Sequence, residues 1–275
     1  MMYEKNKRKD FMWLEYTILG IVQGIAEWLP VSSEGLVSLI KIHFFPSDNM
    51  FNIIKLALFL HLGTFFSALV YLRKDVARLF KTLFHYKKSS VENKKTLMFL
   101  ITSTIVSVIL ALGIVLIVSK IAASMGHPGK IIAGGIGILL ILTGILQLTI
   151  KKTGIREIKD LTKKDAILLG LMQGFAALPG LSRSGSTIAM LLLRQFDKKT
   201  ALKLSFLMSL PIVLIGNIFL AFKYFDPNLE SLLGFLFSFV FGLLTIHSLF
   251  KIAEKINFGY FVLLFGILTI FSLFI

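Results

Sequence analysis

The stretch formed by residues 19–35, LGIVQGIAEWLPVSSEG, decides the fold, because polar side chains there interrupt an apolar helical run. Gln23 and Glu27 lie one helical turn apart, and Pro30 ends the run. A degenerate copy, LGLMQGFAALPGLSRSGST, occupies residues 169–187, about 150 positions later. Two matched interruptions indicate an internal repeat.

The composition is far more apolar than that of a soluble domain. Of the 275 residues 56% are hydrophobic, and the mean hydropathy is +0.82. Several apolar runs approach the roughly 20 residues that a bilayer-spanning helix needs, whereas the short alternating segments of a membrane β-barrel are absent. We therefore expect an all-α polytopic membrane protein.

The charge pattern and the lack of cysteine exclude several functions. The net charge is +15, but the basic residues cluster in short segments between the apolar runs, which is typical of membrane topology signals and argues against nucleic-acid binding. Without cysteine there are no disulfides, thiolate nucleophiles or thiolate metal sites. Residues 1–10 are basic and no small-residue cleavage pattern follows them, so we do not expect a removed signal peptide.

The apolar runs divide into two similar halves of one membrane domain, residues 1–275. A helical run that ends at a proline and continues as a second arm too short to cross the bilayer predicts a re-entrant hairpin, whose tip should line a wet cavity. Each half should contain one hairpin and three spans. The first repeat, residues 11–150, has its hairpin at 11–45 and spans at 51–72, 96–119 and 130–150; the second, residues 165–275, has its hairpin at 165–195 and spans at 200–222, 229–250 and 256–275.

An odd number of spans per half predicts an inverted-topology repeat with six transmembrane helices and two re-entrant hairpins. The segments 73–95, 151–164, 194–203 and 251–256 fall on one side and together hold 20 Lys or Arg, against 9 on the other side. The positive-inside rule therefore places these segments in the cytoplasm and opens the site to the outer face of the plasma membrane. The basic N-terminus argues for the opposite orientation.

Glu27 is the first candidate for chemistry, because a carboxylate at membrane depth costs several kcal/mol unless it has a partner, a proton or a metal. Gln23 shares its helix face. The structural alternatives are a protonated or arginine-paired carboxylate for Glu27 and an interhelical hydrogen bond for Gln23.

Ser32, Ser33 and Glu34 follow the proline break directly. They occupy the turn and the first residues of the next arm, where free backbone N–H groups and the positive helix end favour an anion such as phosphate. The alternative is ordinary helix capping, with a serine as N-cap and Glu34 as a first-turn acid.

The second tip adds hydroxyl donors around one guanidinium, that of Arg183, which is able to grip phosphate oxygens in two-pronged fashion. The hydroxyls belong to Ser182, Ser184, Ser186 and Thr187. A structural ion pair of Arg183 with Glu27 or Glu34 is the alternative, and it would also bring the two tips together. His61, inside the first expected span, predicts an interhelical hydrogen bond and not a catalyst.

At these residues the chain resembles the undecaprenyl-diphosphatase family, the bacitracin-resistance type of integral-membrane lipid phosphatase. The main matches are QGIAEWLPVSSEG at 23–35 and PGLSRSGST at 179–187. Weaker matches, HLGT at 61–64, YLRKD at 71–75 and SFLMSLP at 205–211, extend the resemblance over nearly the whole chain.

The resemblance implies the same fold and a hydrolase. The family removes the terminal phosphate of a polyprenyl diphosphate, which regenerates the monophosphate carrier used in cell-wall peptidoglycan synthesis, and a divalent cation, Mg²⁺ or Ca²⁺, usually assists. Carried over by position, Glu27 matches a family acidic residue, Ser33 the nucleophilic or phosphate-orienting hydroxyl, and Arg183 the phosphate-binding arginine.

Two departures from the family pattern affect the expected chemistry. Gln23 stands where the family commonly has a second Glu, and Leu36 stands where it has a His, so the usual histidine base or nucleophile is missing. If Ser33 attacks, Glu27 or Glu34 is the nearest acid by sequence to take its proton. Alternatively a metal-bound water attacks and the serine orients the phosphate.

We therefore expect a lipid diphosphate whose isoprenoid chain lies between spans and whose head group enters a cavity between the two tips. Glu27, Ser33 and Arg183 are the expected catalytic residues, and Glu27 with Glu34 is expected to hold the cation or act as base. The expected phosphate contacts are Gln23, Ser32, Glu34, Ser182, Ser184, Ser186 and Thr187.

The expected partners are a long-chain isoprenoid diphosphate lipid and the bilayer, with a homodimer as an option. The competing function is a transporter or flippase for polyprenyl monophosphate, because inverted repeats with broken helices also build secondary transporters.

Overall fold

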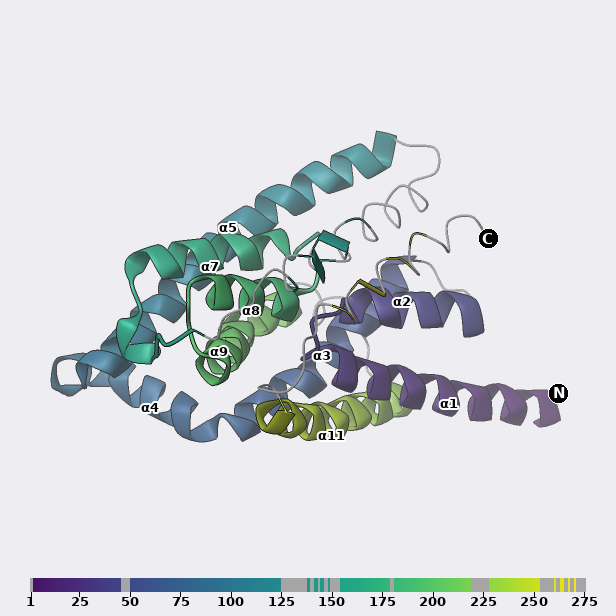
Figure 1. Ribbon diagram of the computed structural model, residues 1–275. Coiled ribbons are helices and arrows are strands. Elements are labelled where there is room, and N and C mark those ends of the chain that lie inside the picture. Colours follow the sequence, from purple (N-terminus) through teal and green to yellow (C-terminus); the bar gives the residue numbers. More distant parts are fainter. Residues whose placement is uncertain are drawn as a thin grey trace.

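The computed structural model describes residues 2–45, 50–124, 154–178, 181–218 and 228–252, with scattered positions between 138 and 270. Within these residues the regular secondary structure is helical apart from one isolated β-bridge, between Arg156 and Phe196, and turns and irregular segments join the helices. The helices are α1 (Met2–Ala26), α2 (Ser33–Phe44), α3 (Met50–Tyr71), α4 (Arg73–Phe84), α5 (Val91–Ser124), α7 (Lys163–Phe175), α8 (Arg183–Leu193), α9 (Lys198–Gly216) and α11 (Leu229–Ile252), with 3-10 turns η1 (Tyr86–Lys88) and η2 (Ile158–Asp160) (Figure 1).

The chain is a polytopic membrane protein. Three described helical segments are long and apolar enough to cross a bilayer: Val91–Ile117, Lys198–Gly216 and Leu229–Ile252. A fourth candidate is the pair Lys55–Tyr71 and Arg73–Phe84, two helices that meet at 82°. These helices match the expected spans 96–119, 200–222, 229–250 and 51–72, whereas the spans expected at 130–150 and 256–275 lie largely outside the described residues.

The two polar interruptions form equivalent capped turns. After α1 ends at Ala26, the Ser32 Oγ accepts a hydrogen bond from the Gly35 N–H at 3.2 Å and begins α2. After α7 ends at Phe175, the Ser182 Oγ accepts from the Gly185 N–H at 3.1 Å and begins α8. Helices α2 and α8 have 12 and 11 residues. At 1.5 Å per residue each is shorter than about 20 Å, too short for the roughly 30 Å hydrocarbon core.

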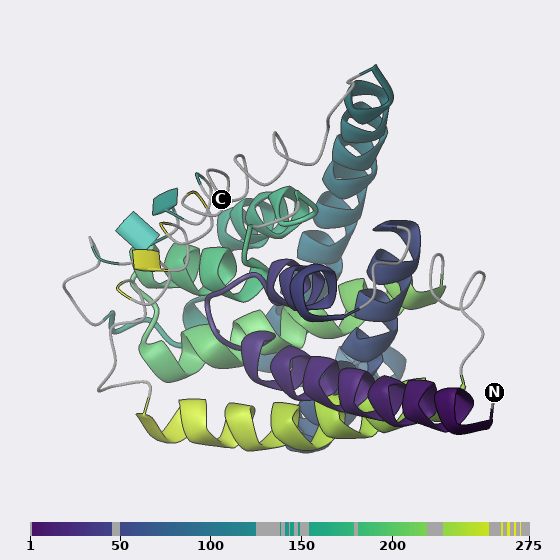
Figure 2. The ribbon, with the colours of Figure 1, turned by 90° about the vertical axis from the view of Figure 1, so that its right-hand side faces the viewer.

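The arms that precede these turns pack in a reciprocal way. Helix α1 lies along α11, and its counterpart α7 lies along α5 (Figures 1 and 2). Glycines allow both approaches: a Cβ at Gly20 would lie 2.2 Å from the Gly234 carbonyl oxygen, and one at Gly170 would lie 2.8 Å from the Ser103 carbonyl oxygen. Each arm thus packs against a long helix of the other half of the sequence.

A tryptophan anchors the first turn in the core. The indole of Trp28 is 1% exposed and packs edge-on against Phe206 of α9, with ring centroids 4.7 Å apart. Ile246 and Leu249 of α11 and Ala68 of α3 belong to the same buried cluster. Because Glu27 precedes this anchor directly, its carboxylate is held where α3, α9 and the second turn converge.

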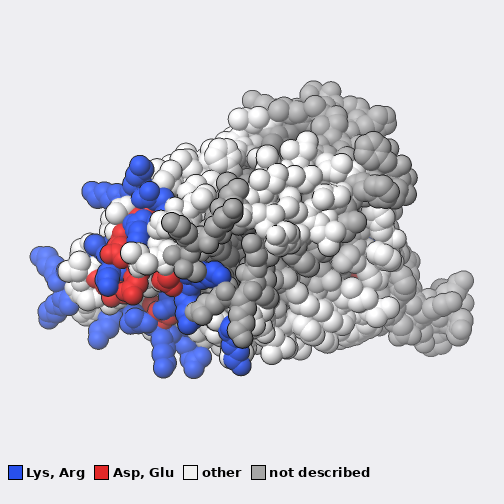
Figure 3. Space-filling model, viewed as in Figure 1, with Lys and Arg blue, Asp and Glu red and all other residues white. Residues whose placement is uncertain are grey.

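On the face drawn in Figure 3, most of the described charged side chains lie at one end of the molecule, which we call the basic end. It is formed by α4, η1, η2 and the first residues of α5, α7 and α9. Helix α7 begins at this end, whereas α1 begins at the opposite end, and the two arms run toward each other into the interior (Figure 1).

A buried ion cluster closes the base of the α7–α8 pair at the basic end. The Asp165 carboxylate, fully buried, accepts hydrogen bonds from Arg156 Nη2 at 2.7 Å and from Arg194 Nε at 2.7 Å. The Thr162 hydroxyl donates to it at 2.6 Å. Burial alone would raise the pKa of Asp165, but these donors outweigh it and lower the pKa from 3.8 to about 2.

Candidate active site

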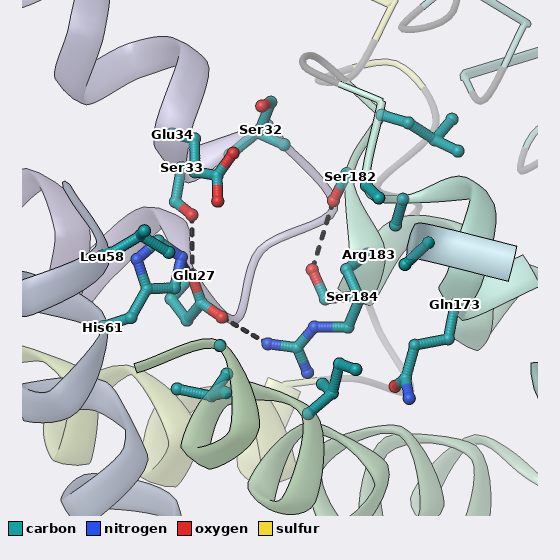
Figure 4. Close-up of a pocket in the computed structure, with 18 of the residues that line it drawn as sticks. Glu27, Ser32, Ser33, Glu34, Leu58, His61, Gln173, Ser182, Arg183 and Ser184 are labelled. Carbon is teal, nitrogen blue, oxygen red and sulfur yellow. Dashed lines mark hydrogen bonds and ion pairs between the residues drawn. The ribbon is translucent and has the colours of Figure 1, made fainter. Parts of the chain in front are cut away.

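The two capped turns meet at one cavity of about 170 Å³ (Figure 4). Its walls come from the α1–α2 turn, the α7–α8 turn, the middle of α3, Ala111 of α5 and the C-terminal part of α9. This volume is below the roughly 300–1,000 Å³ of clefts that enclose a drug-sized ligand. The cavity therefore suits a small polar group and not a long hydrocarbon chain.

The carboxylate of Glu27 contacts more of the polar side chains at the cavity than does any other group among the described residues, and the side chain is almost completely buried. One carboxylate oxygen, Oε1, pairs with Nη2 of Arg183 from the second turn. The other, Oε2, accepts from the Ser33 hydroxyl at 2.7 Å and from Gln23 Nε2 at 3.0 Å, and it lies 3.1 Å from His61 Nε2. The buried carboxylate is thus compensated by donors from both turns and from α3.

Arg183, in the first turn of α8, reaches the Glu27 carboxylate. Its guanidinium lies 5.9 Å from the centre of the Trp28 ring, which restricts its orientation. Its second nitrogen, Nη1, is buried and has no hydrogen-bond partner among the described residues. One arm of the guanidinium therefore holds Glu27, and the other is an unsatisfied donor within the described residues.

The serines of the two turns join the tips to each other. Ser184 Oγ donates to the Leu29 carbonyl at 2.6 Å, across 155 positions of sequence. Ser182 and Ser184 lie 3.2 Å apart through their hydroxyl oxygens. Ser32, Ser33, Ser182 and Ser184 all line the cavity, so four of the predicted phosphate-contacting or catalytic hydroxyls converge there.

Three of the predicted phosphate contacts do not line the cavity. The hydroxyls of Ser186 and Thr187 donate to the Arg183 carbonyl at 3.1 and 2.8 Å, as helical Ser and Thr side chains commonly do, and Thr187 also lies 2.7 Å from Ser205 Oγ. Gln23 is fully buried behind Glu27. These residues support the turn and the carboxylate from outside the cavity wall.

The carboxylate pair does not form a ready cation site. Both oxygens of Glu27 are already occupied by donors that include a guanidinium, and no group of three His, Asp or Glu among the described residues could hold a metal ion. Glu34 is different: it lines the cavity and is exposed. A divalent cation shared by Glu27 and Glu34 does not fit this arrangement.

Three polar residues that line the cavity are absent from the predicted site: His61, Gln173 and Asn217. Gln173 occupies the position equivalent to Gln23, so the repeat itself carried that signal. His61 forms the predicted hydrogen bond, and it also lines the cavity. A single histidine in an apolar helix does not show from sequence which neighbouring helices it faces. Asn217, near the end of an apolar span, gives no sequence signal.

Two amide side chains belong to residues that line the cavity. Gln173 Nε2 lies 3.2 Å from Ser107 Oγ, whose proton is donated to the Thr104 carbonyl, and Asn217 Nδ2 donates to the Val213 carbonyl at 3.1 Å. These partners fix both amide orientations. Gln173 Oε1 and Asn217 Oδ1 are buried and have no hydrogen-bond partner among the described residues, so two residues of the cavity wall each carry an unsatisfied acceptor.

The chain is similar to three curated proteins named undecaprenyl-diphosphatase. The one from Methanococcoides burtonii is 40% identical over 252 residues, covering 90% of this chain and 93% of that protein. The one from Haloarcula marismortui is 33% identical over 250 residues, covering 88% and 90%. The one from Alkaliphilus metalliredigens is 36% identical over 263 residues, covering 89% and 91%.

A family model agrees with these relatives. The model described as bacitracin resistance protein BacA matches residues 16–271, which include both turns and every residue that lines the cavity. The chain therefore belongs to the bacitracin resistance protein BacA family of membrane proteins.

Proposed function

We propose that this protein is an undecaprenyl-diphosphatase, which hydrolyses the terminal phosphate of undecaprenyl diphosphate to give undecaprenyl monophosphate and orthophosphate. The observation that carries the proposal is the meeting of Glu27 with Arg183 and Ser33 in one buried cavity. The names of the relatives supply the substrate class.

We propose the full fold to be an inverted repeat of six spans and two re-entrant hairpins, α1–α2 and α7–α8. Arms α1 and α7 run inward from opposite ends of the molecule, and α2 and α8 are too short to cross (Figure 1). The reciprocal packing of α1 on α11 and α7 on α5 is what a two-fold relation between the halves requires. The positive-inside rule assigns the basic end to the cytoplasm.

The proposed site opens to the outer face of the plasma membrane. Its α9 wall consists of Ile212, Val213, Gly216 and Asn217, at the end of α9 far from the basic end. The diphosphate would enter the cavity, with the isoprenoid chain left between the apolar spans. Arg183 Nη1 donates to a phosphate oxygen, and Gln173 and Asn217 accept from a water or a phosphate hydroxyl.

The reaction proposed for these residues is phosphoryl transfer to Ser33. The Ser33 hydroxyl already donates to Glu27 Oε2 at 2.7 Å, so Glu27 is placed to accept its proton as Oγ bonds to the terminal phosphorus. The bond from that phosphorus to the bridging oxygen breaks, and its electron pair leaves on the lipid monophosphate. Arg183 offsets the charge that develops on the transferred phosphoryl oxygens.

A divalent cation, Mg²⁺ or Ca²⁺, remains part of the proposal, with Glu34 and not Glu27 as its protein ligand. Such ions are commonly held by one or two carboxylates together with substrate phosphates, and they neutralise phosphate charge. Glu34 is the cavity carboxylate that is not engaged by Arg183. Replacing Glu34 by Gln should raise the cation concentration needed for turnover, measured by titrating Mg²⁺ after chelation.

The experiment is orthophosphate release from undecaprenyl diphosphate by the purified protein in detergent. We expect turnover by the wild type and by Arg73→Ala, a control whose exposed guanidinium contacts only the Val70 carbonyl in the described structure. Arg183→Ala should lose at least about 100-fold, the size of a lost charge-stabilising donor. A protein that binds polyprenyl monophosphate but releases no phosphate under any cation, and moves that lipid in vesicles, would be the transporter instead.

A further inference from the structure

We infer that His61 shares one exchangeable proton with Glu27 and thereby makes the carboxylate an effective acceptor of the Ser33 proton, an inference that rests on the proposed hydrolysis. His61 acts on the reaction through Glu27, so it is a positioning residue. Its imidazole comes from the middle of α3, a different element from both turns.

Hydrogen-bond partners at both ring nitrogens place that proton. Nδ1 lies 2.6 Å from the Ala57 carbonyl oxygen, which can only accept, so Nδ1 carries a hydrogen. Nε2 lies 3.1 Å from Glu27 Oε2. A neutral imidazole has only one N–H, so a second hydrogen must lie between Nε2 and Oε2, on one atom or the other. The two side chains therefore form a pair that holds one proton in this arrangement.

Nearby charged groups affect how the proton is shared between Glu27 and His61. Arg183 contacts Glu27 Oε1 and favours the carboxylate, and Glu34 on α2 lies close enough to interact electrostatically with His61. The neighbouring spans carry their described charged residues near their ends: Lys198, Lys199 and Lys203 on α9, and Glu230 and Lys251 on α11. Since His61 is only 7% exposed, bulk salt screens these interactions weakly.

The pair of Glu27 and His61 accepts and returns the proton in both steps of the reaction, the formation of phosphoserine and its hydrolysis. When it has lost its proton, Oε2 and Nε2 face each other at 3.1 Å as two lone-pair acceptors, and the Ser33 proton enters between them as Oγ bonds to phosphorus. The pair passes that proton to the departing lipid monophosphate. Water then attacks the phosphoserine; one water proton returns through the pair to Ser33 Oγ, and the other stays on the orthophosphate.

The test compares His61→Gln with His247→Gln in the full-length protein. His247 lies on α11, is exposed, and contacts Tyr71 with ring centroids 6.2 Å apart, outside the cavity. Glutamine at 61 keeps a side-chain N–H for Glu27 but does not titrate. We expect His61→Gln to lower kcat by about 100-fold or more with KM nearly unchanged, and to remove the limb of the pH–rate profile that belongs to the pair. His247→Gln should match the wild type.

Chemical rescue separates proton exchange from support of the structure. His61→Ala should recover turnover when imidazole is added, and the recovery should follow the pKa of a series of substituted imidazoles. If His61→Gln keeps the wild-type kcat and pH profile, the inference is wrong although the proposed function stands. Absence of phosphate release by the wild type would instead remove the proposed function.

A measurement on the wild type covers the case in which the His61 variants do not fold. In ¹⁵N-histidine spectra of the intact protein in detergent, assigned after replacement of the other four histidines, the His61 nitrogens should titrate across the pH range in which kcat changes. A His61 signal that remains that of one neutral tautomer throughout this range would overturn the inference.

Discussion

At the scale of single residues, Glu27 explains why the two turns stay together. A buried carboxylate that loses a partner becomes an uncompensated charge, which costs about 3–5 kcal/mol in proteins. Arg183, His61, Ser33 and Gln23 all approach its two oxygens. Substrate phosphate adds negative charge beside this carboxylate, and the unpaired Nη1 of Arg183 is the donor left to meet it.

Ser33→Ala should separate binding from turnover. The change removes the oxygen proposed to attack but leaves Arg183 Nη1 and the capping serines in place, so phosphate release should fall by at least about 10³-fold while lipid diphosphate still binds. Release kinetics and equilibrium binding measure the two effects. Ser38→Ala, on the same helix but outside the cavity, is the control. Wild-type turnover by Ser33→Ala would favour direct attack by water.

The sequence could predict an ion pair of Arg183 with Glu27 or Glu34, because Arg183 is the only basic residue between Asp165 and Arg194, but it could not choose between the two acids. It also offered one of the serines after the first proline break as an N-cap, whereas the cap formed by Ser182 is known only from the structure. It could not predict His61 or Asn217 as cavity residues, because the facing of α3 and α9 toward the turns depends on tertiary packing. Leu36, where the family resemblance leads one to expect a histidine, packs beside Ala26 and Val31.

At the scale of helices, close backbone approach holds the arms in register. Gly20 of α1 faces Gly234 of α11, and their nearness leaves no room for a methyl group. The polar base of the α7–α8 pair is held instead by Asp165, which joins the start of α7 to Arg194 at the end of α8. The close approach of Gly20 to Gly234 and the ion pair of Asp165 with Arg194 fix the positions of α1 and α7, and thereby the positions of the side chains at the two turns.

Gly20→Ala should destabilise the protein, whereas Gly113→Ala should not. A Cβ at Gly20 would lie 2.2 Å from a backbone oxygen, so α1 and α11 must move apart, while one at Gly113 of α5 meets nothing within 4 Å. We expect a loss of about 1–3 kcal/mol for Gly20→Ala and a gain of up to about 1 kcal/mol for Gly113→Ala. Unfolding in mixed micelles measures both. Equal effects of the two substitutions would contradict the close α1–α11 packing.

Asp165 should make stability fall in acid. Its pKa is about 2 in the folded protein and 3.8 as a free side chain, so its stabilisation is complete above about pH 4 and is lost as the pH falls toward 2. The difference corresponds to about 2 kcal/mol. Asp165→Asn should flatten this part of the stability curve, and Glu92→Gln, an exposed acid, should leave it unchanged. An unaltered acid limb in Asp165→Asn would count against the cluster.

The hydrophobic pattern of the sequence predicts where α3 ends but not the bend between α3 and α4. The apolar run 51–72 predicts α3 to within one residue, and the polar residues Arg73, Lys74 and Asp75 predict its end. The helix instead turns by 82° and continues as α4. No proline or glycine marks Leu72, so the bend follows from where apolar surface gives way to charge.

At the scale of the whole molecule, two turns that lie about 150 residues apart in the sequence line one cavity. Helices α1 and α7 begin at opposite ends of the molecule, and the basic end is the proposed cytoplasmic side (Figures 1 and 3). The repeat at 19–35 and 169–187 predicts this reciprocity from sequence, whereas the spans expected at 130–150 and 256–275 remain predictions.

The absence of cysteine allows the orientation to be measured without background labelling. Ser89→Cys, beside η1 at the basic end, should react with an impermeant maleimide only after the cells are permeabilised. Phe44→Cys, exposed at the last residue of α2, should react in intact cells. The reverse pattern would place the cavity opening on the cytoplasmic face.

The central claim is that Glu27 from one repeat and Arg183 from the other act as one catalytic unit. The most direct measurement is kcat/KM for phosphate release by Glu27→Gln, Arg183→Ala and the double variant. Groups that act together lose function non-additively, so the double variant should be no slower than the slower single variant by more than a few-fold. Losses that multiply would show that the two residues act independently, and would contradict a single site built where the repeats meet.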